Sequence, residues 1–444
     1  MNEIFDQFIK TLAQTERMSL RNLALYQEQL LIRLVQHACE SLPFYRSRLG
    51  CLFTAEGHVD LSRWNDVPIL TRGDAMAHSR NMRVAQLPTE YGPIGEFRTS
   101  GSTGVPLPIA TNGLVFLAAN ALFTRMARWF GLDTSRPLAA IRLFTNGTVP
   151  PNPEGSVSNG WCLGDPKSLM YELELMTPVE QQLEWLARCK APYLLTQASG
   201  ALAIAHAVTP AQGRALGIEM VFLVGETIPD GTREIISERL GAHVAGIYSS
   251  QEVGTIACEC EVAPHYHVTS ENALVEILDD EGRDVAPGER GHVVVTSFYY
   301  YAMPFIRYEL GDIAVAGAAP CPCGRALPVI AQIEGRTRNA FVFRDGTRFW
   351  PRAAMVRPMH AFVPFQRFQL VQLDHERIEL RYISDGSGRQ PDLVGLNAYA
   401  QKTFHSSVQL SICEMDTFAP GPSGKVEQFI SHVPASALSN LARA

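Results

Sequence analysis

A loop rich in glycine and hydroxyl side chains is the first stretch whose residue types suit chemistry. It reads "RTSGSTGVP" over residues 98–106. Glycines let backbone N–H groups turn toward phosphate oxygens, and serine and threonine hydroxyls add further donors. The loop does not match the nucleotide-binding pattern GxxxxGK[ST], because its spacing differs and Val105 stands where a lysine is usual. Alone, this stretch is equally typical of a flexible turn.

Further motifs follow the loop in a fixed order. They are "GETIPDGTREIISERLG" (225–241), "IYSSQEVG" (247–254), "RYELGDI" (307–313), "GRTRN" (335–339) and "SGKVEQF" (423–429). Each is ordinary in isolation, since charged residues such as Glu252, Asp312 and Lys425 are most often exposed on the surface. The ordered set is far more specific than any one member.

Together these motifs resemble the signature of the adenylate-forming enzymes, the superfamily of acyl-CoA synthetases, adenylation domains and luciferases, and within it the phenylacetate–CoA ligase branch. The segments "RLVQHACESLPFYRSRL" (33–49) and "DVPILTRGDAM" (66–76) share the resemblance, which thus covers nearly the whole chain. It implies an ATP-dependent ligase that forms an acyl-adenylate from an aromatic or arylalkyl carboxylic acid. The acyl group would then pass to coenzyme A. Such a protein mainly positions its reactants and stabilises charge on the phosphorus centre.

The resemblance also implies a role for individual residues. Glu252 would hold Mg²⁺, a hard cation that prefers oxygen ligands. Lys425 would reach the acyl carboxylate and the α-phosphate, and Asp312 would accept hydrogen bonds from the ribose hydroxyls with Arg336 beside it. The remaining nucleotide contacts implied are Ser100, Gly101, Ser102, Thr103 and Gly104 for the β- and γ-phosphates, and Gly225, Glu226, Thr227, Tyr248 and Ser249 for the adenine end.

Two departures from the family pattern bear on function. Relatives carry a lysine where Val105 stands, so we expect weaker ATP binding rather than lost chemistry, since Mg²⁺ and Lys425 also neutralise the phosphates. At the hinge, Thr337 and Arg338 follow "GR" where an acidic residue is usual, and "PRAAM" (351–355) lacks the common glutamate. Transfer to an amine or a carrier-protein thiol is therefore an alternative to coenzyme A. A catalytically weakened nucleotide-binding module is an alternative of another class.

Thiols and imidazoles gather in two clusters, "CECEVAPHYH" (258–267) and "CPC" (321–323). They supply enough nitrogen and sulfur ligands for four-coordinate zinc. Some members of the phenylacetate–CoA ligase branch carry a Cys, His and Cys-x-Cys set here, and the matching residues are Cys260, His267, Cys321 and Cys323, with Cys258 and His265 as substitutes. With no position left open, we expect the zinc to be structural. Buried free thiols are the alternative.

The acyl pocket is predicted from two further segments. "LFTNG" (143–147) resembles the family segment whose phenylalanine lies beside the aryl ring, which nominates Phe144. "TQASGALA" (196–203) would form the opposite wall, where Ala198, Ser199 and Gly200 leave room for a flat aromatic acid. Phe144 is as often a simple core residue. A Ser/His/Asp hydrolase is excluded because the chain has no G-x-S-x-G elbow.

Hydrophobic spacing indicates the elements that must position these residues. Residues 1–50 are expected to be helical, and the Thr71 to Asp74 spacing is typical of a helix start. Strands alternate with helices over residues 137–250, which predicts crossover units and a parallel sheet covered by helices. Antiparallel strands follow from residue 267. The expected fold is α/β, with a large N-terminal domain (1–334), a hinge (335–338) and a small mobile C-terminal α+β domain (339–444).

Composition sets outer limits on function. The net charge of the 444 residues is -7 and no dense Lys/Arg run is present, so nucleic-acid binding is not expected. The longest apolar run, residues 114–123, is shorter than the ~20 residues of a membrane span. The odd number of cysteines, nine, and the lack of a signal peptide predict a reducing cytoplasm. The family resemblance further implies a homodimer.

Overall fold

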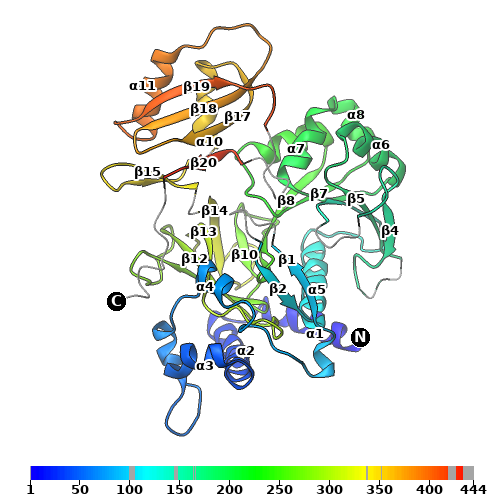
Figure 1. Cartoon of the computed structure of the whole chain (residues 1–444). Helices are drawn as coiled ribbons and strands as arrows, with labels where there is room; N and C mark the ends of the chain where they lie inside the picture. Colours follow the sequence, from blue (N-terminus) through cyan, green and yellow to red (C-terminus); the bar gives the residue numbers. More distant parts are fainter. Residues whose placement is uncertain are drawn as a thin grey trace.

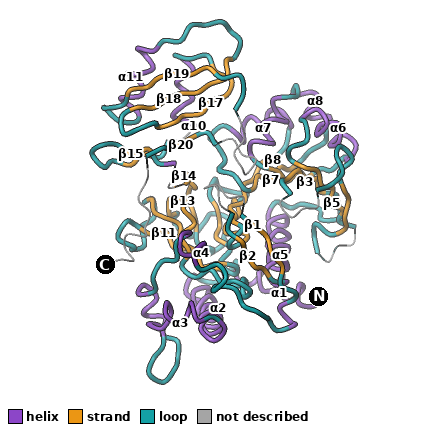
Figure 2. The backbone as a smooth tube through the Cα atoms, in the orientation of Figure 1, coloured by secondary structure: helices purple, strands orange, loops and turns teal. Residues whose placement is uncertain are grey.

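The structure is a computed structural model that describes residues 2–99, 106–144, 149–163, 165, 167–336, 339–351, 353–418 and 427–433. Figures 1 and 2 show a large body built around one long sheet, with a smaller group of C-terminal elements at one end. The α-helices of the described residues are α1 (Asn2–Thr15), α2 (Leu20–Ser41), α3 (Pro43–Leu49), α4 (Arg72–Ala77), α5 (Gly113–Trp129), α6 (Val179–Cys189), α7 (Ala198–His206), α8 (Pro210–Ala215), α9 (Thr232–Leu240), α10 (Ala353–Val356) and α11 (Leu393–Thr403).

The long sheet has twelve strands in the order β11-β12-β13-β14-β10-β9-β8-β7-β6-β3-β5-β4. Strands β3, β5, β6, β7 and β8 are parallel, whereas β4 and the strands from β9 onward pair antiparallel. Their bounds are β3 (Leu138–Arg142), β4 (Ser156–Asn159), β5 (Leu169–Glu174), β6 (Tyr193–Thr196), β7 (Met220–Val224), β8 (His243–Ser250), β9 (Gly254–Glu259), β10 (Tyr266–Val268), β11 (Ala273–Leu278), β12 (Arg290–Ser297), β13 (Tyr308–Ala316) and β14 (Val329–Arg336).

Helices cover both faces of the parallel part, which is why β7 reads as an unbroken apolar run, "MVFLV". Successive side chains of a strand point to opposite faces. Accordingly, Val221 and Leu223 pack with residues of α6, α7 and α9, such as Trp185. Met220 and Phe222 face the other side, where they pack with α5. The expected parallel sheet with helical cover is confirmed.

The N-terminal helices pack on the antiparallel part. Leu34 and Val35 of α2 lie in the same buried core as Val293, Val295 and Tyr308. The helical character expected over residues 1–50 is confirmed, and it is divided among α1, α2 and α3. Ser19 caps α2 by accepting a hydrogen bond from the Asn22 N–H, and α3 starts at Pro43, whose fixed φ suits the first turn of a helix.

The C-terminal elements have a core of their own. A four-stranded sheet in the order β19-β18-β17-β20 packs with α11, and a hairpin of β15 and β16 precedes it. The strands are β15 (Phe341–Val342), β16 (Arg348–Phe349), β17 (Phe365–Gln372), β18 (Arg377–Ser384), β19 (Gln409–Glu414) and β20 (Phe429–Ser431). Arg348 Nη1 lies 3.2 Å from Asp280 Oδ1, and the Arg290 guanidinium lies 5.6 Å from the centre of the Trp350 ring, so these groups hold the small part against the large one.

The remaining elements are a hairpin and several short segments that were not predicted from the sequence. Strands β1 (Gly95–Arg98) and β2 (Pro108–Thr111) pair antiparallel and flank the glycine- and serine-rich loop. Strands β4 and β5 and the short α8 fall between the anticipated elements. The expected start at Thr71 is confirmed, because Thr71 and Asp74 form a reciprocal capping box at α4. In the described residues, no helix combines the length and apolarity needed to cross a bilayer.

Gly213 is the position where α8 approaches α9 most closely, which gives a test of this packing. A Cβ there would lie 2.1 Å from the backbone oxygen of Arg239. We expect Gly213→Ala to lower the free energy of unfolding by about 1–3 kcal/mol, because the clash is with backbone. Gly50→Ala is the control. No heavy atom outside the adjacent residues lies within 4 Å of a Cβ built at Gly50, and the Gly50 φ of -58° suits alanine. Equal urea midpoints for the two variants would contradict this packing.

Candidate active site

The candidate residues gather where the parallel strands end. Phe144 follows β3, Ala198 follows β6, Glu226 follows β7, and Glu252 follows β8. Strand β3 has β5 on one side and β6 on its other side. The chain therefore crosses from one side of β3 to the other between β5 and β6. In open α/β sheets, ligands bind outside the carboxyl ends of the strands, at the point where the strand order reverses. The edge beside β3 and β6 is therefore the place where this fold is expected to bind a ligand.

Asp312 lies at the centre of a polar cluster contributed by three strands. Tyr248 Oη, from β8, donates to Asp312 Oδ2 at 2.8 Å, and Arg336 Nε, from β14, lies 3.5 Å from Asp312 Oδ1. Asp312 and Arg336 are paired across β13 and β14, so the sheet register itself brings them together. Burial, together with the Asp312 carboxylate, raises the pKa of Tyr248 well above its usual value, and the phenol stays a neutral donor. Asp312 likewise raises the pKa of Arg336.

Glu252 is a buried carboxylate beside the base of the glycine-rich loop. Tyr308 Oη donates to Glu252 Oε1 at 3.3 Å, and Arg72 Nη1 lies 3.5 Å from the same oxygen. Arg72 Nη2 donates to Thr99 Oγ1 at 3.2 Å. Thr99 is the last described residue before the loop, so its hydroxyl links the loop base to Glu252 through Arg72. Loop residues Ser100, Gly101, Ser102, Thr103 and Gly104 lie outside the described residues, as do Val105 and Lys425.

The "GET" motif and the segment after β6 are joined by Glu226. Ser199 donates to Glu226 from its backbone N–H at 2.9 Å and from its hydroxyl at 3.0 Å. Gly225, just before Glu226, has a φ of +78°, which favours glycine. A nucleotide motif and a predicted acyl-pocket wall thus form one surface. Thr227 lies one residue further along the chain, and Ser249 is in β8 next to Tyr248.

Phe144 is half-buried rather than a core residue. The Arg142 guanidinium lies 4.9 Å from the centre of its ring. The Phe144 backbone N–H donates to Glu174 Oε2 at 3.3 Å, at the end of β5. Leu175 reaches toward the segment after β6, because a Cβ on Gly200 would lie 3.0 Å from Leu175 Cδ1. The two predicted walls are therefore neighbours, with small residues on one side.

Several buried side-chain oxygens at this edge have no hydrogen-bond partner among the described residues. Buried polar groups are normally paired, so such atoms indicate contacts that a ligand or ordered water completes. They occur at the ends of β5, β6 and β8 and directly after β6 and β8: Glu174 Oε1, Thr196 Oγ1, Gln197 Oε1, Ser250 Oγ and Gln251 Oε1. This edge is thus lined by side-chain oxygens that make no hydrogen bond to the described residues.

A second cluster lies between β9 and β10, on β10 itself and in the turn that contains residues 321–323. The ligand atoms of Cys260, His265, His267 and Cys321 all lie within 4.8 Å of one another. His265 Nε2 is 3.1 Å from Cys321 Sγ, and His267 Nε2 is 3.2 Å from Cys323 Sγ, so Cys323 adjoins the group. Cys258 instead packs in the apolar core between the sheet and α5. Two thiols and two imidazoles form a donor set that zinc takes.

The surroundings of this cluster fix it to the N-terminal helix. Burial lowers the pKa of His267 to about 4, which keeps its imidazole neutral. Arg325, two residues after Cys323, lies 4.2 Å from the centre of the Trp129 ring and pairs with Glu261 at 2.8 Å. Trp129 Nε1 in turn donates to Glu16 Oε2 at 2.8 Å. The cluster therefore connects strands, α5 and the end of α1.

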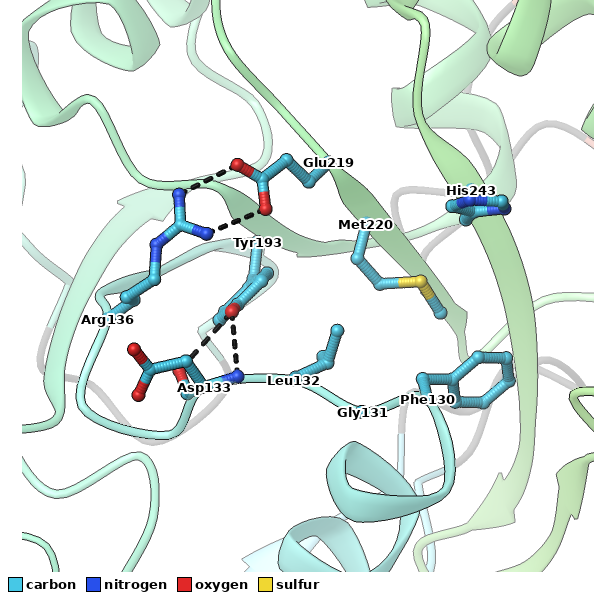
Figure 3. Close-up of a pocket in the computed structure, with 9 residues that line it drawn as sticks. All are labelled: Phe130, Gly131, Leu132, Asp133, Arg136, Tyr193, Glu219, Met220 and His243. Carbon is cyan, nitrogen blue, oxygen red and sulfur yellow. Dashed lines mark hydrogen bonds and ion pairs between the residues drawn. The ribbon is translucent and has the colours of Figure 1, made fainter.

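A surface hollow of about 310 Å³ lies at the opposite edge of the parallel strands (Figure 3). It is lined by Tyr193, Met220 and His243 at the starts of β6, β7 and β8. Two of its charged side chains are paired with each other, because Arg136 donates to both oxygens of Glu219 at 2.7 and 2.8 Å. This hollow is separate from the candidate site.

Comparison with known proteins gives no matching family model. A phenylacetate–coenzyme A ligase from Thermus thermophilus is 26% identical over 351 residues, 76% of this chain and 75% of that protein. A 2-hydroxyisobutyryl-CoA ligase in its postadenylation state, in complex with R3-HIB-AMP, superposes with a TM-score of 0.75 at 18% identity, covering 94% of this chain and 91% of its own. The TM-score is 0.62, at 19% identity and the same coverage, for that ligase with 2-HIB-AMP and CoA in the thioesterification state. An amide bond synthetase from Marinactinospora thermotolerans gives 0.52 at 14% identity, covering 71% of this chain and 65% of its own.

These comparisons show the fold of the chain and what it is similar to. The chain has the fold of the adenylate-forming ligases, with a large α/β part and a small C-terminal part. Within that class it is similar to phenylacetate–CoA ligase, as its motifs predict, and the resemblance drawn from the sequence is confirmed. Sequence reasoning did not single out Arg72, Tyr308 or Thr99. Arg72 stands inside the quoted "DVPILTRGDAM", but its role depends on contacts that sequence spacing does not give.

Proposed function

We propose that this protein uses ATP to activate an aromatic or arylalkyl carboxylic acid as its acyl-adenylate, and then transfers the acyl group to coenzyme A. The observation that carries the proposal is the cluster of Tyr248, Asp312 and Arg336 beside Glu252, at the edge where such folds bind ligands. Similarity to phenylacetate–CoA ligase and to 2-hydroxyisobutyryl-CoA ligase supports it.

Each group in the cluster suits a part of ATP. Asp312 would accept hydrogen bonds from the ribose hydroxyls, and Tyr248 holds that carboxylate by a hydrogen bond while its ring would lie against the adenine. Glu252 would carry Mg²⁺, whose charge offsets that of the phosphates. Gly225, Glu226 and Thr227 would border the adenine, and Lys425 would approach the reacting carboxylate. Phe144 and the small residues after β6 would enclose the acid.

We further propose the domain boundaries 1–334, 335–338 and 339–444. The buried cores support this division, since Ile330 belongs to the core of the large part and Phe341 to that of the small part. The better superposition on the postadenylation state than on the thioesterification state supports a small domain that changes its position between two half-reactions.

We also propose that the cysteine and histidine cluster holds structural zinc. The donor set supports this assignment: Cys260, His265, His267 and Cys321 converge, with Cys323 adjacent. Bound zinc would stabilise the deprotonated thiolates and lock the turn at 321–323 onto β9 and β10. A homodimer and a reducing cytoplasmic location stay predictions from the sequence.

The experiment that tests the proposed function is pyrophosphate release with a panel of aromatic acids, with and without coenzyme A. We expect acid-dependent release of pyrophosphate, and an acyl-CoA product identified by mass spectrometry when coenzyme A is present. Release that ignores coenzyme A would instead support an amine or carrier-protein acceptor, because the same fold serves an amide bond synthetase. No release with any acid would contradict the ligase and favour a nucleotide-binding module.

A further inference from the structure

The turn between β8 and β9, residues 251–253, carries Glu252 and is held by two buried side chains from distant parts of the chain. We propose that Tyr300 and Asn272 are positioning residues, which fix the backbone of this turn so that the Glu252 carboxylate stands ready for Mg²⁺. The proposal rests on the proposed function, because it adds two residues to the support of the same nucleotide site. Neither residue belongs to a motif that the sequence singled out.

Tyr300 holds the residue that precedes Glu252. Its hydroxyl donates to the backbone carbonyl of Gln251 at 2.8 Å, and the residue is only 3% exposed. Burial raises the pKa of Tyr300 far above its usual value, with a smaller contribution from the Glu252 carboxylate, so the hydroxyl keeps the proton that it donates. The backbone on the β8 side of Glu252 therefore has a fixed partner that water does not reach.

Asn272 holds the residues that follow Glu252. Its side-chain Nδ2 donates to the Val253 carbonyl at 3.0 Å and to the Thr255 carbonyl at 2.7 Å. An asparagine amide has two N–H donors, so both are used on this stretch of backbone. Asn272 is 5% exposed and Val253 is fully buried in the core of the large part. The backbone is thus fixed on both sides of Glu252.

The support for the backbone is packed against the support for the carboxylate. Tyr308 Oη donates to Glu252 Oε1 at 3.3 Å. The Phe305 ring lies edge-to-face between the two tyrosines, with its centre 6.2 Å from that of Tyr300 and 5.1 Å from that of Tyr308. One aromatic group therefore holds the turn through one hydroxyl and the carboxylate through another.

Such an arrangement favours metal binding because the ligand is in place before the metal arrives. Ordering a flexible segment costs conformational entropy, and a preorganised group avoids that cost when charge must be stabilised. Groups that orient a metal ligand typically contribute about 10- to 100-fold to metal affinity or activity. Without Tyr300 and Asn272, Mg²⁺ would have to order the turn as it bound, and its affinity would fall.

The first test removes the Tyr300 hydroxyl and keeps the ring. We expect Tyr300→Phe to raise the Mg²⁺ concentration that gives half-maximal ATP binding, measured by calorimetry, by about 10-fold, the lower end of the range above. Excess Mg²⁺ should restore the affinity for ATP. The matched control is Tyr193→Phe, because Tyr193 is 1% exposed and donates to the Asp133 backbone carbonyl at 3.3 Å, at the opposite edge of the sheet. Both variants should lose a similar amount of Tm, but only Tyr300→Phe should change the Mg²⁺ requirement.

The second test asks whether Tyr300 acts through the carboxylate. Residues that act as one unit are not additive, so Tyr300→Phe should add little to the Mg²⁺ requirement of a Glu252→Gln variant. Asn272→Leu keeps the side-chain size and removes both donors. It should raise the Mg²⁺ requirement at least as much as Tyr300→Phe does, and it provides a second measurement of the same role.

Three results would overturn this role. Equal Mg²⁺ requirements in Tyr300→Phe and Tyr193→Phe would show that Tyr300 only supports the fold. A full effect of Tyr300→Phe in the Glu252→Gln background would show that Tyr300 does not act through Glu252. An unchanged Mg²⁺ requirement in Glu252→Gln alone would leave no metal ligand to position. All three come from nucleotide binding, so they are distinct from a failure of every acid to release pyrophosphate, which would contradict the ligase.

Discussion

Glutamine in place of Glu252 is expected to slow acyl-adenylate formation by about 10²- to 10³-fold, the cost typical of removing one preorganised electrostatic group from an active site. Glu252 is only 8% exposed and is held by Tyr308 Oη at 3.3 Å and Arg72 at 3.5 Å. An amide of the same shape keeps the packing but loses the negative charge that we propose to bind Mg²⁺. The measurement is ATP–pyrophosphate exchange, with Mg²⁺ titrated from micromolar to millimolar.

The Mg²⁺ titration separates a metal role from a purely structural one. We expect Glu252→Gln to need more Mg²⁺ for half-maximal exchange while its Tm stays near that of the native protein. Glu238→Gln is the matched control, because Glu238 is exposed on α9, away from the site. An unchanged Mg²⁺ requirement together with an unchanged rate would remove Glu252 from the metal site.

The sequence predicts where the site lies better than it predicts which residues contact one another there. Motif order places Tyr248, Glu252 and Asp312 in one site, and the structure gathers them at the carboxyl edge of the sheet. The partners of these residues depend on long-range register. Tyr308, on β13, contacts Glu252, which follows β8, although β14, β10 and β9 stand between the two strands in the sheet order. Such pairings join residues far apart in the chain, and local spacing does not encode them.

Elements with strong local signals were predicted, and those with weak ones were not. The apolar run of β7 and the capping residues of α4 each carry their own signal, and both elements form as expected. Strand β5, "LMYELE", and short β4 stand between loops and gain their stability from pairing with each other and with β3. The joining of the parallel and antiparallel parts into one sheet also depends on tertiary pairing, at β8 and β9.

The cysteine and histidine cluster shows the same division between residue type and arrangement. Ligand chemistry picks out the cysteines and histidines, but it cannot choose among Cys258, His265 and Cys323. The structure turns Cys258 into the core and brings His265 Nε2 to 3.1 Å from Cys321 Sγ. Cys323 Sγ stays within 3.2 Å of His267 Nε2. Two possible sets of zinc ligands follow: two sulfurs with two nitrogens, or three sulfurs with one nitrogen.

Removal of the proposed zinc is expected to lower the Tm by about 5–10 °C, because the metal would tie separate segments together and metal binding adds directly to folding free energy. Without that zinc, the turn that contains Cys321 would lose its metal link to Cys260, just after β9, and to His267 on β10. We expect one zinc per chain by elemental analysis. Cys321→Ser should lose the zinc and the stability together, whereas Cys189→Ser on α6, outside the cluster, should lose neither.

The two donor sets predict different outcomes for Cys323→Ser. If zinc is bound by Cys260, His265, His267 and Cys321, this variant should keep the metal and most of the Tm, and His265→Ala should lose both. If Cys323 is the fourth ligand in place of His265, the two variants should exchange outcomes. Cobalt substitution gives an independent measurement, because the thiolate-to-metal charge-transfer band grows with the number of sulfur ligands. Full retention of stability after complete chelation would contradict both sets and leave the cysteines as ordinary buried thiols.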